Sequence, residues 1–268
     1  MKPLALEWPD ADVRSRLHAL HPDFQLEILN EADSTNTQLL SRLHQGVTTP
    51  TLLVVENQTA AKGRMGKKWQ VQLGHSLTFS ILTPTCLENI GWLALVSACS
   101  LVEILQKKLN MPPASQLKIK WPNDIWLKPM PDTPWHKLVG ILIETATVNQ
   151  QRYAVIGIGI NISTCSSQNA TEIPLGYLTQ LGSQWDVPTA FAHIAPDIVQ
   201  AVYNFKKEDI PHWKALFQRY DLLSNQPLRT SNGVTGIGLG VNSQGQFLIK
   251  TGDGIQTIHS GEVSIRPC

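Results

Sequence analysis

Apolar and polar residues alternate through the first two thirds of the chain in a way that predicts a β-sheet. Apolar or alternating runs of strand length recur there, separated by turn-forming residues. The runs are residues 24–29, 51–56, 76–82, 117–128, 136–144 and 152–162. The run 117–128 is interrupted by Pro122, Asn123 and Asp124, so it predicts a strand, a turn and a second strand. Together these runs favour a mixed sheet.

Apolar residues at helical spacing predict five helices around these strands. They cover residues 11–20, the segment after residues 33–37, and residues 91–109, 190–203 and 210–220. Ser34 or Thr35 could cap the second helix. Pro196 lies inside the fourth, and we expect it to kink or divide that helix, because proline cannot donate the internal hydrogen bond.

The pattern changes after residue 221. Residues 222–268 are short alternating runs with turns at residues 231–233, 242–245 and 251–254, typical of a small β-barrel. Residues 163–171 are polar and predict a loop. We therefore expect an α+β protein. Residues 1–220, with 1–23 as an N-terminal extension, form the mixed sheet with its helices, and residues 221–268 form the barrel.

Composition narrows the class of protein. The chain has 268 residues, 42% of them hydrophobic, and a net charge of +1, so bulk charge gives no case for binding nucleic acid or an acidic membrane surface. The four cysteines form no CxxC pair, which is typical of reduced thiols in a cytoplasmic protein. The N-terminus lacks the apolar core of a signal peptide. The longest apolar segment, residues 90–105, contains Ser97, Ser100 and Glu103, and we expect it to be too polar and short to span a bilayer.

A basic, glycine-containing loop at residues 59–69 is the first candidate for chemistry. Gly63 and Gly66 allow backbone N–H groups to turn inward as an anion-binding nest. Cationic side chains stand beside these glycines, at Lys62, Arg64, Lys67 and Lys68. Such a loop suits a phosphate, although for the loop alone a solvated basic turn is the simpler interpretation.

Other polar groups are set into the predicted sheet. Ser34, Thr35 and Asn36 stand at a helix start, where capping alone would explain them. Lys120 and Asp124 flank a turn that is common in hairpins, and Lys137 at a strand start would ordinarily extend to solvent. Residues 157–161 place two glycines on alternate positions, which opens one face of a strand to close approach.

These groups together favour adenylyl transfer. The sequence has no nucleophile elbow, Walker loop, zinc motif or serine–histidine pairing signal. It offers anion-binding groups and one acidic residue, Asp124, that could hold Mg²⁺. A carboxylate substrate would attack the α-phosphate of ATP, with cations stabilising the developing charge.

The spelling and order of these segments resemble bacterial biotin–protein ligases, which attach biotin to carboxylase carrier proteins. The family's glycine–arginine loop is matched by residues 62–69, its Lys-Trp-Pro-Asn-Asp hairpin by residues 120–124, its Lys-x-x-Gly-Ile-Leu-x-Glu strand by residues 137–144, and its Gly-x-Gly-x-Asn segment by residues 157–161. Residues 261–266 resemble the last strand of the family's C-terminal barrel. The resemblance runs from about residue 24 to the end, and it implies a class II synthetase-like catalytic domain followed by an SH3-like barrel.

The resemblance implies substrates and roles for individual residues. The substrates would be biotin and ATP with Mg²⁺, and Arg64, Lys137 and Asp124 would be catalytic, Asp124 also holding the metal. The biotin-binding residues would be Ser34, Thr35, Asn36, Gln58, Lys62, Gly63, Arg64, Lys137, Gly140 and Gly159. The nucleotide-binding residues would be Lys62, Arg64, Trp69, Lys120, Asn123, Asn161 and Tyr177.

Two departures from the family pattern modify these expectations. Ala61 replaces a glycine, and Lys62 and Met65 replace arginines, which removes bidentate donors from the loop. Some relatives carry an N-terminal winged helix-turn-helix, and residues before 24 are too few for one, so we expect no DNA binding. The expected partner is a biotin carboxyl carrier protein, with no membrane, and the enzyme would be a monomer or weak homodimer.

Two other functions stay open at this point. A lipoate or octanoate ligase or transferase resembles this family in fold, but the hairpin and basic-loop spellings favour biotin. A non-catalytic biotin-binding sensor would not need Arg64, Asp124 and Lys137, which are phosphate-directed groups.

Overall fold

The computed structural model describes residues 6–86, 90–165, 173–259 and 265–267. A seven-stranded mixed sheet forms its centre, with the strand order β1-β2-β3-β7-β6-β5-β4. Only β1 and β2 pair in parallel, and the other neighbours are antiparallel. The strands are β1 (Gln25–Ala32), β2 (Thr51–Gln58), β3 (Ser76–Thr85), β4 (Gln116–Lys120), β5 (Asp124–Lys128), β6 (His136–Val148) and β7 (Gln151–Asn161). The predicted mixed sheet is confirmed.

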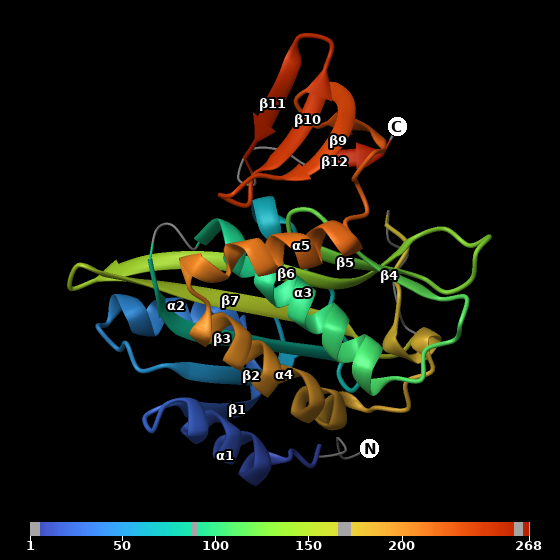
Figure 1. Ribbon diagram of the computed structural model, residues 1–268. Helices are drawn as coiled ribbons and strands as arrows, with labels where there is room; N and C mark the ends of the chain where they lie inside the picture. Colours follow the sequence, from blue (N-terminus) through green and yellow to red (C-terminus); the bar gives the residue numbers. More distant parts are fainter. Residues whose placement is uncertain (1–5, 87–89, 166–172, 260–264, 268) are drawn as a thin grey trace.

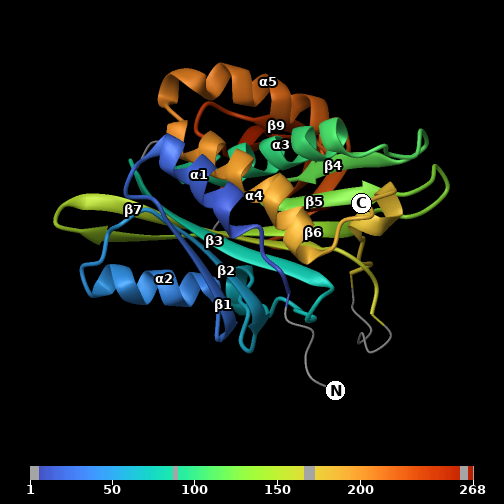
Figure 2. The ribbon, with the colours of Figure 1, turned by 90° about the horizontal axis from the view of Figure 1, so that it is seen from below.

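Helices cover the sheet unequally. The helices are α1 (Asp10–Leu20), α2 (Thr35–His44), α3 (Ile90–Lys108), α4 (Val187–Asn204) and α5 (Ile210–Tyr220), with short 3₁₀ turns η1 (Arg64–Gly66), η3 (Leu178–Leu181) and η4 (Lys207–Asp209). Figure 2 shows α1, α3, α4 and α5 on one face and α2 alone on the other. Two apolar clusters match these faces, a large one around α3 and a small one where Leu39 and Leu43 of α2 meet β2 and β7. The α2 face is therefore only partly covered, which leaves room for a site.

The expectation that Pro196 would divide its helix is wrong, and a kink at Pro196 stays a prediction. α4 runs unbroken from Val187 to Asn204. Proline frees the carbonyl four residues earlier, and here the Ala192 carbonyl accepts a hydrogen bond from Arg16 of α1 at 3.4 Å. Lys108 donates to the next carbonyl, that of His193, at 2.8 Å. Neighbouring helices thus compensate for the missing internal bond.

The expectation that residues 90–105 are too polar and short to span a bilayer needs a correction for helix α3. By length and composition α3 could cross a bilayer, contrary to the expectation from its polar residues. However, 67% of its apolar window is buried inside the protein. It is the only such helix among the described residues, and its burial marks it as the core helix of this fold.

The C-terminal region forms a second, antiparallel sheet with the strand order β11-β10-β9-β8-β12. The strands are β8 (Pro227–Thr230), β9 (Thr235–Val241), β10 (Phe247–Thr251), β11 (Gly254–Ile258) and β12 (Ile265–Pro267). This agrees with the predicted small β unit after the helices. Figure 1 shows it standing above the N-terminal end of α3 and above η1. The predicted loop at residues 163–171 and the start of the predicted last strand at residue 261 lie largely outside the described residues.

The second sheet is docked by close backbone contact. A Cβ on Gly91 would lie 2.3 Å from the Gln244 carbonyl oxygen, so only glycine fits there. The indole N–H groups of Trp92 and Trp121 donate to the carbonyls of Ser243 and Gly245 at 2.9 and 3.0 Å. The turn between β9 and β10 is therefore fixed against α3 and the β4–β5 hairpin.

Candidate active site

The start of α2 is held by β2 rather than by its own cap. Ser34 occupies the N-cap position, but its side chain makes no capping hydrogen bond, so capping does not explain it. The Ser34 N–H donates to Asp33 Oδ1 at 2.7 Å, and the Thr35 N–H donates to Gln58 Oε1 at 2.8 Å. A hydrogen bond from Gln38 lowers the pKa of Asp33 and keeps it ionised. Thr35 and Gln58, predicted to act together, do lie together.

A chain of polar side chains runs inward from Thr35. Ser80 Oγ of β3 lies 2.6 Å from both Thr35 Oγ1 and Asn36 Oδ1. Asn36 Nδ2 donates to Glu144 Oε2 of β6 at 2.8 Å. A Cβ on Gly157 would lie 2.3 Å from Asn36 Oδ1. Gly157 therefore admits Asn36 rather than a ligand, which corrects half of the expectation for the two glycines.

The other glycines admit an aromatic ring. Gly140 and Gly159 face each other across β6 and β7, and a Cβ on either would lie 2.7 or 2.5 Å from the indole of Trp69. Lys137 Nζ lies 5.5 Å from the centre of the same ring. The close approach predicted at Gly140 and Gly159 is present, and it is made by Trp69 in this structure.

Lys137 is the cation at the centre of the site. Its Nζ pairs with Asp124 Oδ1 at 2.7 Å, and both side chains are mostly buried, at 19% and 16% exposed. The Lys137 carbonyl accepts from Asn161 Nδ2 at 3.2 Å and from the Gly176 N–H at 2.8 Å. The ion pair neutralises both charges, so neither Lys137 nor Asp124 is an unpaired buried charge.

The basic loop closes over the sheet. The Gly63 N–H donates to the Lys67 carbonyl at 2.7 Å, and Lys62 bridges to Lys68 in an antiparallel pair. Arg64 Nη1 donates to Asn123 Oδ1 at 3.1 Å. Burial lowers the pKa of Arg64, and the Asp124 carboxylate opposes that effect. Arg64 therefore connects the loop to the hairpin that carries Asp124.

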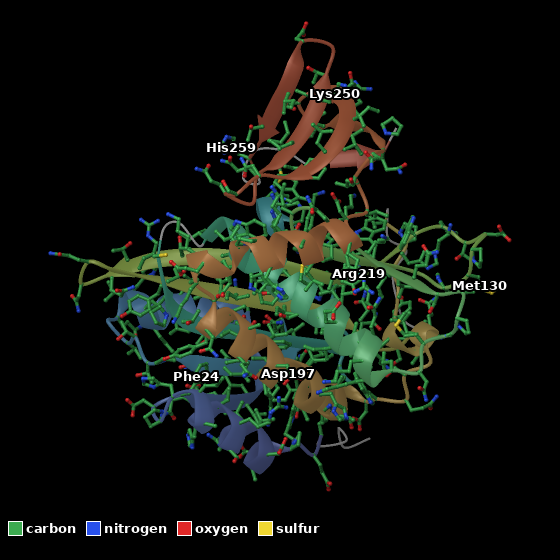
Figure 3. The ribbon with its side chains drawn as sticks, viewed as in Figure 1. Phe24, Met130, Asp197, Arg219, Lys250 and His259 are labelled. Atoms are coloured by element: carbon green, nitrogen blue, oxygen red, sulfur yellow. The ribbon has the colours of Figure 1, made fainter. Side chains whose placement is uncertain are left out.

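Two cavities meet at this loop. The smaller, about 420 Å³, lies between the loop and the side chains of Leu142 and Glu144. The larger, about 1090 Å³, lies on the α3 side of β6 and is bounded by the second sheet at Ser243–Gln246 and His259. Figure 3 shows His259 at the end of the second sheet nearest the first. Arg64 lines both cavities, whereas Lys137, Thr35 and Gln58 line neither. Glu144, which lines the smaller cavity, contacts Asn36 of α2. We place the site on the α2 face.

Two predicted residues stand apart from this centre. Lys120 Nζ lies 4.6 Å from the centre of the Trp126 ring, on the strand that pairs with Asp124. Tyr177 follows the segment that pairs with Lys137, but its side chain is only 9% exposed and lines neither cavity. Its contact with adenine stays a prediction.

The sequence interpretation missed Ser80 and Glu144 as parts of the site. Glu144 had a signal, since it is an acid ending an apolar strand, but its partner Asn36 is 108 residues away in the chain. Ser80 sits in an apolar run and gave no signal.

The arrangement can hold an elongated ligand with two chemically different ends. Thr35 and Gln58 offer neutral hydrogen bonding, and Lys137 and Arg64 offer positive charge for an anion. No group of three or more possible metal ligands exists among the described histidines, cysteines and acids. Asp124 alone could contribute one carboxylate.

Comparison with known proteins identifies two sequence families along the chain. Residues 29–161 match the Biotin/lipoate A/B protein ligase family, and residues 228–266 match the Biotin protein ligase C terminal domain. These two matches cover the sheet with its site and the second sheet.

Individual relatives agree with the family matches. The chain is 29% identical over 248 residues to the bifunctional ligase/repressor BirA of Escherichia coli, covering 89% of this chain and 73% of that protein. It is 30% identical over 143 residues to the biotin–[acetyl-CoA-carboxylase] ligase of Mycobacterium tuberculosis, 52% of this chain and 50% of that one. A biotin protein ligase from Aquifex aeolicus in complex with biotin and ATP superimposes with a TM-score of 0.71 and 28% identity, covering 91% of this chain and 99% of that one.

Proposed function

Because the chain belongs to the biotin protein ligase family, we propose that it activates biotin with ATP and transfers the biotinyl group to a biotin carboxyl carrier protein. One observation supports this most directly. The Lys137–Asp124 pair stands beside Gly140 and Gly159, with Arg64 reaching the same hairpin through Asn123. Such a site combines cations for a phosphate with a glycine-lined hollow in which the Trp69 indole lies.

The first step forms biotinyl-5′-AMP. The biotin carboxylate oxygen attacks the α-phosphorus of ATP, the bond to the bridging oxygen breaks, and pyrophosphate leaves. Lys137 separates from Asp124 and stabilises the charge that moves onto the α-phosphate, and Arg64 binds the same phosphate from the loop.

The second step transfers the acyl group. An unprotonated carrier lysine attacks the acyl carbon, the amide bond forms, the bond to the phosphate oxygen breaks, and AMP leaves. The attacking nitrogen loses a proton to water, and Asp124, free of Lys137, orients that amine. No protein nucleophile is required.

Residue roles within this proposal are those that the family resemblance implies. Thr35, Ser34 and Gln58 bind the ureido group, and Gly140 and Gly159 bring backbone near the rings. Lys62, Trp69, Asn123 and Asn161 bind the phosphate and nucleotide, and Lys62 and Gly63 also contact biotin. A contact of Lys120 with the nucleotide stays a prediction. Asn36 is 2% exposed and acts behind Thr35 rather than touching the ligand.

Mg²⁺ fits this site only together with the nucleotide. Mg²⁺ prefers six oxygen ligands and is often held by one carboxylate plus substrate phosphates and water. Asp124 provides a single carboxylate, already paired with Lys137. We therefore propose that the metal is held chiefly by ATP oxygens, with Asp124 as its one protein ligand.

The remaining features of the proposal are broader. We propose a catalytic unit at residues 1–220, a C-terminal unit at 221–268, a cytoplasmic location, and a monomer or weak dimer. The described cysteines, Cys86, Cys99 and Cys165, are all free thiols, which supports a reducing compartment.

Pyrophosphate exchange tests the proposed function. With ATP, Mg²⁺ and labelled pyrophosphate, exchange should appear only when biotin is added, and labelled biotin should then pass to a carrier protein. Exchange with lipoate or octanoate instead of biotin would establish the alternative ligase. Biotin binding without any exchange would indicate a sensor, and an obligatory covalent biotinyl-enzyme would contradict the two-step scheme.

A further inference from the structure

The donor and acceptor of each hydrogen bond between Glu144, Asn36, Ser80 and Thr35 can be assigned from the chemistry of the side chains. Asn36 Nδ2 lies 2.8 Å from Glu144 Oε2 and 3.5 Å from the Leu142 carbonyl oxygen. A carboxylate and a carbonyl only accept hydrogen bonds. The amide NH₂ of Asn36 must therefore face them, and its Oδ1 must face Ser80.

Ser80 then decides the direction of the next bond. Its Oγ lies 2.6 Å from both Asn36 Oδ1 and Thr35 Oγ1, but it has one proton. Asn36 Oδ1 has none, so the Ser80 proton lies in that contact. The Thr35 hydroxyl has two possible acceptors, Ser80 Oγ at 2.6 Å and Gln58 Oε1 at 3.5 Å. The contact with Ser80 is much the shorter, and two oxygens at 2.6 Å without a proton between them would repel, so Thr35 donates its proton to Ser80. The Thr35 hydroxyl then presents only lone pairs to the ligand.

The Gln58 side-chain amide is oriented so that it presents a donor to the ligand, whereas Thr35 presents an acceptor. Its Oε1 accepts from the Thr35 N–H at 2.8 Å, so its NH₂ end is the part left to face the ligand. An acceptor and a donor thus stand side by side. This pair is complementary to an N–H next to a C=O, as in a cyclic urea.

We propose that Glu144 is a positioning residue which, through Asn36 and Ser80, fixes the Thr35 hydroxyl as an acceptor and so selects a ligand with an N–H at that point. The proposal rests on the proposed function, which supplies the cyclic ureido ligand. Asn36, Ser80 and Thr35 are 2%, 0% and 4% exposed, so water has little access to replace a lost partner. Without the Glu144 carboxylate, the Asn36 side-chain amide can rotate by 180° and place its NH₂ toward Ser80. Ser80 would then donate to Thr35, and the Thr35 hydroxyl would become a donor to the ligand.

Glu144→Leu tests the proposal, with Glu144→Gln as the conservative variant. The leucine variant should raise KM for biotin on the order of tenfold in pyrophosphate exchange, as expected for a hydrogen bond to a charged group. KM for ATP and kcat at saturating biotin should stay within about twofold, because the ligand's reacting end is unaffected. Glu144→Gln can still present an oxygen to Asn36 and should restore most of the biotin affinity. Glu31→Leu is the matched control, since Glu31 also accepts from an asparagine, Asn57 at 2.8 Å, outside the site.

The decisive readout is discrimination between ligands. The probes are biotin and its two cyclic carbamate analogues, in which one or the other ring N–H is replaced by oxygen. One analogue should be strongly rejected by the unmutated enzyme, since its ring oxygen meets the lone pairs of Thr35. In Glu144→Leu the ratio of kcat/KM for biotin over that analogue should fall roughly tenfold, because Thr35 can then donate. A merely structural loss would weaken all three ligands alike.

Ser80→Ala provides a second route to the same result. It removes the acceptor of the Thr35 proton and should lower the same ratio, even if Glu144→Leu fails to fold. An unchanged ratio in the folded variants would overturn the proposal. Absence of biotin-dependent exchange in the unmutated protein would instead refute the proposed function, so the two failures are distinguishable.

Discussion

At the scale of single residues, the site depends on two glycines, which make room for an aromatic ring, as much as on its charged and polar side chains. Gly140 and Gly159 leave a hollow that the Trp69 indole fills. The Trp69 Nε1–H is buried and finds no acceptor among the described residues. An unsatisfied buried donor costs about 1–3 kcal/mol. A ligand oxygen that accepts a hydrogen bond from the Trp69 Nε1–H would therefore contribute favourably to binding.

The sequence could predict which residue types form the site but not which of them touch the ligand. Arg64, Asp124 and Lys137 stand out as charges in apolar surroundings, and the structure brings them to one hairpin. Asn36 looks equivalent to Thr35 in the sequence. Only the rotation of α2 against β7 shows that Asn36 points inward at Gly157.

Lys137→Ala should slow adenylate formation far more than it weakens biotin binding. The Lys137 cation is most useful when negative charge moves onto the α-phosphate, and one such group is commonly worth on the order of 3 kcal/mol in the transition state. Single-turnover formation of biotinyl-5′-AMP should fall roughly a hundredfold or more, with the Kd for biotin changing much less. Lys128→Ala is the control, since Lys128 lies 6.0 Å from the Trp135 ring outside the site. A variant with lost biotin affinity but normal turnover at saturation would make Lys137 a binding group only.

At the scale of elements, strand positions were predictable and helix continuity was not. Short apolar runs could predict the strands because a strand that is buried on both faces of a sheet has apolar residues at consecutive positions. Whether Pro196 breaks α4 depends on Arg16, which is far away in the chain and replaces the lost donor to Ala192. Such compensation between helices leaves no local pattern.

The basic loop is the element we expect to act as a lid. Several of its hydrogen bonds lie within the loop, such as Gly63 to Lys67 and Trp69 to Ala61, whereas Arg64 reaches Asn123 of the hairpin. Met65 is 62% exposed at a left-handed backbone position. Biotin with ATP should protect it from trypsin more than either ligand alone, since the adenylate phosphate adds a charge-assisted hydrogen bond to Arg64.

Arg64→Ala should weaken this closure. Tryptic cleavage in the loop should then increase in the presence of both ligands, and biotin labelling of a bystander such as serum albumin should increase because the anhydride escapes. Arg14→Ala, which removes an exposed arginine of α1, serves as the control. Equal cleavage with and without ligands, and equal bystander labelling, would show that the loop is not a lid.

At the scale of the whole molecule, the second sheet completes the larger cavity. Its docking depends on Gly91 meeting the turn at Gly245 and on two tryptophan N–H donors. The partners of those donors lie 151 and 124 residues away in the chain. A sequence pattern can predict a small β unit after residue 221, but it cannot say which face of the first sheet that unit covers.

Asp221 makes the junction between the two parts sensitive to pH. It follows α5, pairs with Ile119 of the edge strand β4, and approaches Gly240 of β9. Its side chain is only 7% exposed, and its Oδ2 is buried without a hydrogen-bond partner among the described residues. This burial raises the pKa of Asp221 from 3.8 to about 6, against the lowering effects of the Leu223 N–H and of Lys118.

Asp221→Asn should therefore stabilise the protein at neutral pH. Between pH 4 and 6 the folded protein holds a proton here that the unfolded chain has lost, so stability contributed by this group falls as pH rises and is gone above about pH 6. The ionised form costs the fold on the order of 2–3 kcal/mol at pH 7. The asparagine keeps an acceptor for Leu223 and avoids that charge, so its free energy of unfolding in urea should exceed that of the parent at pH 8 by about 1–3 kcal/mol. The advantage should shrink toward pH 4.5, whereas Asp253→Asn, on an exposed turn, should show no such trend. An equal difference at both pH values would mean that Asp221 stays ionised throughout and that the junction does not respond to pH.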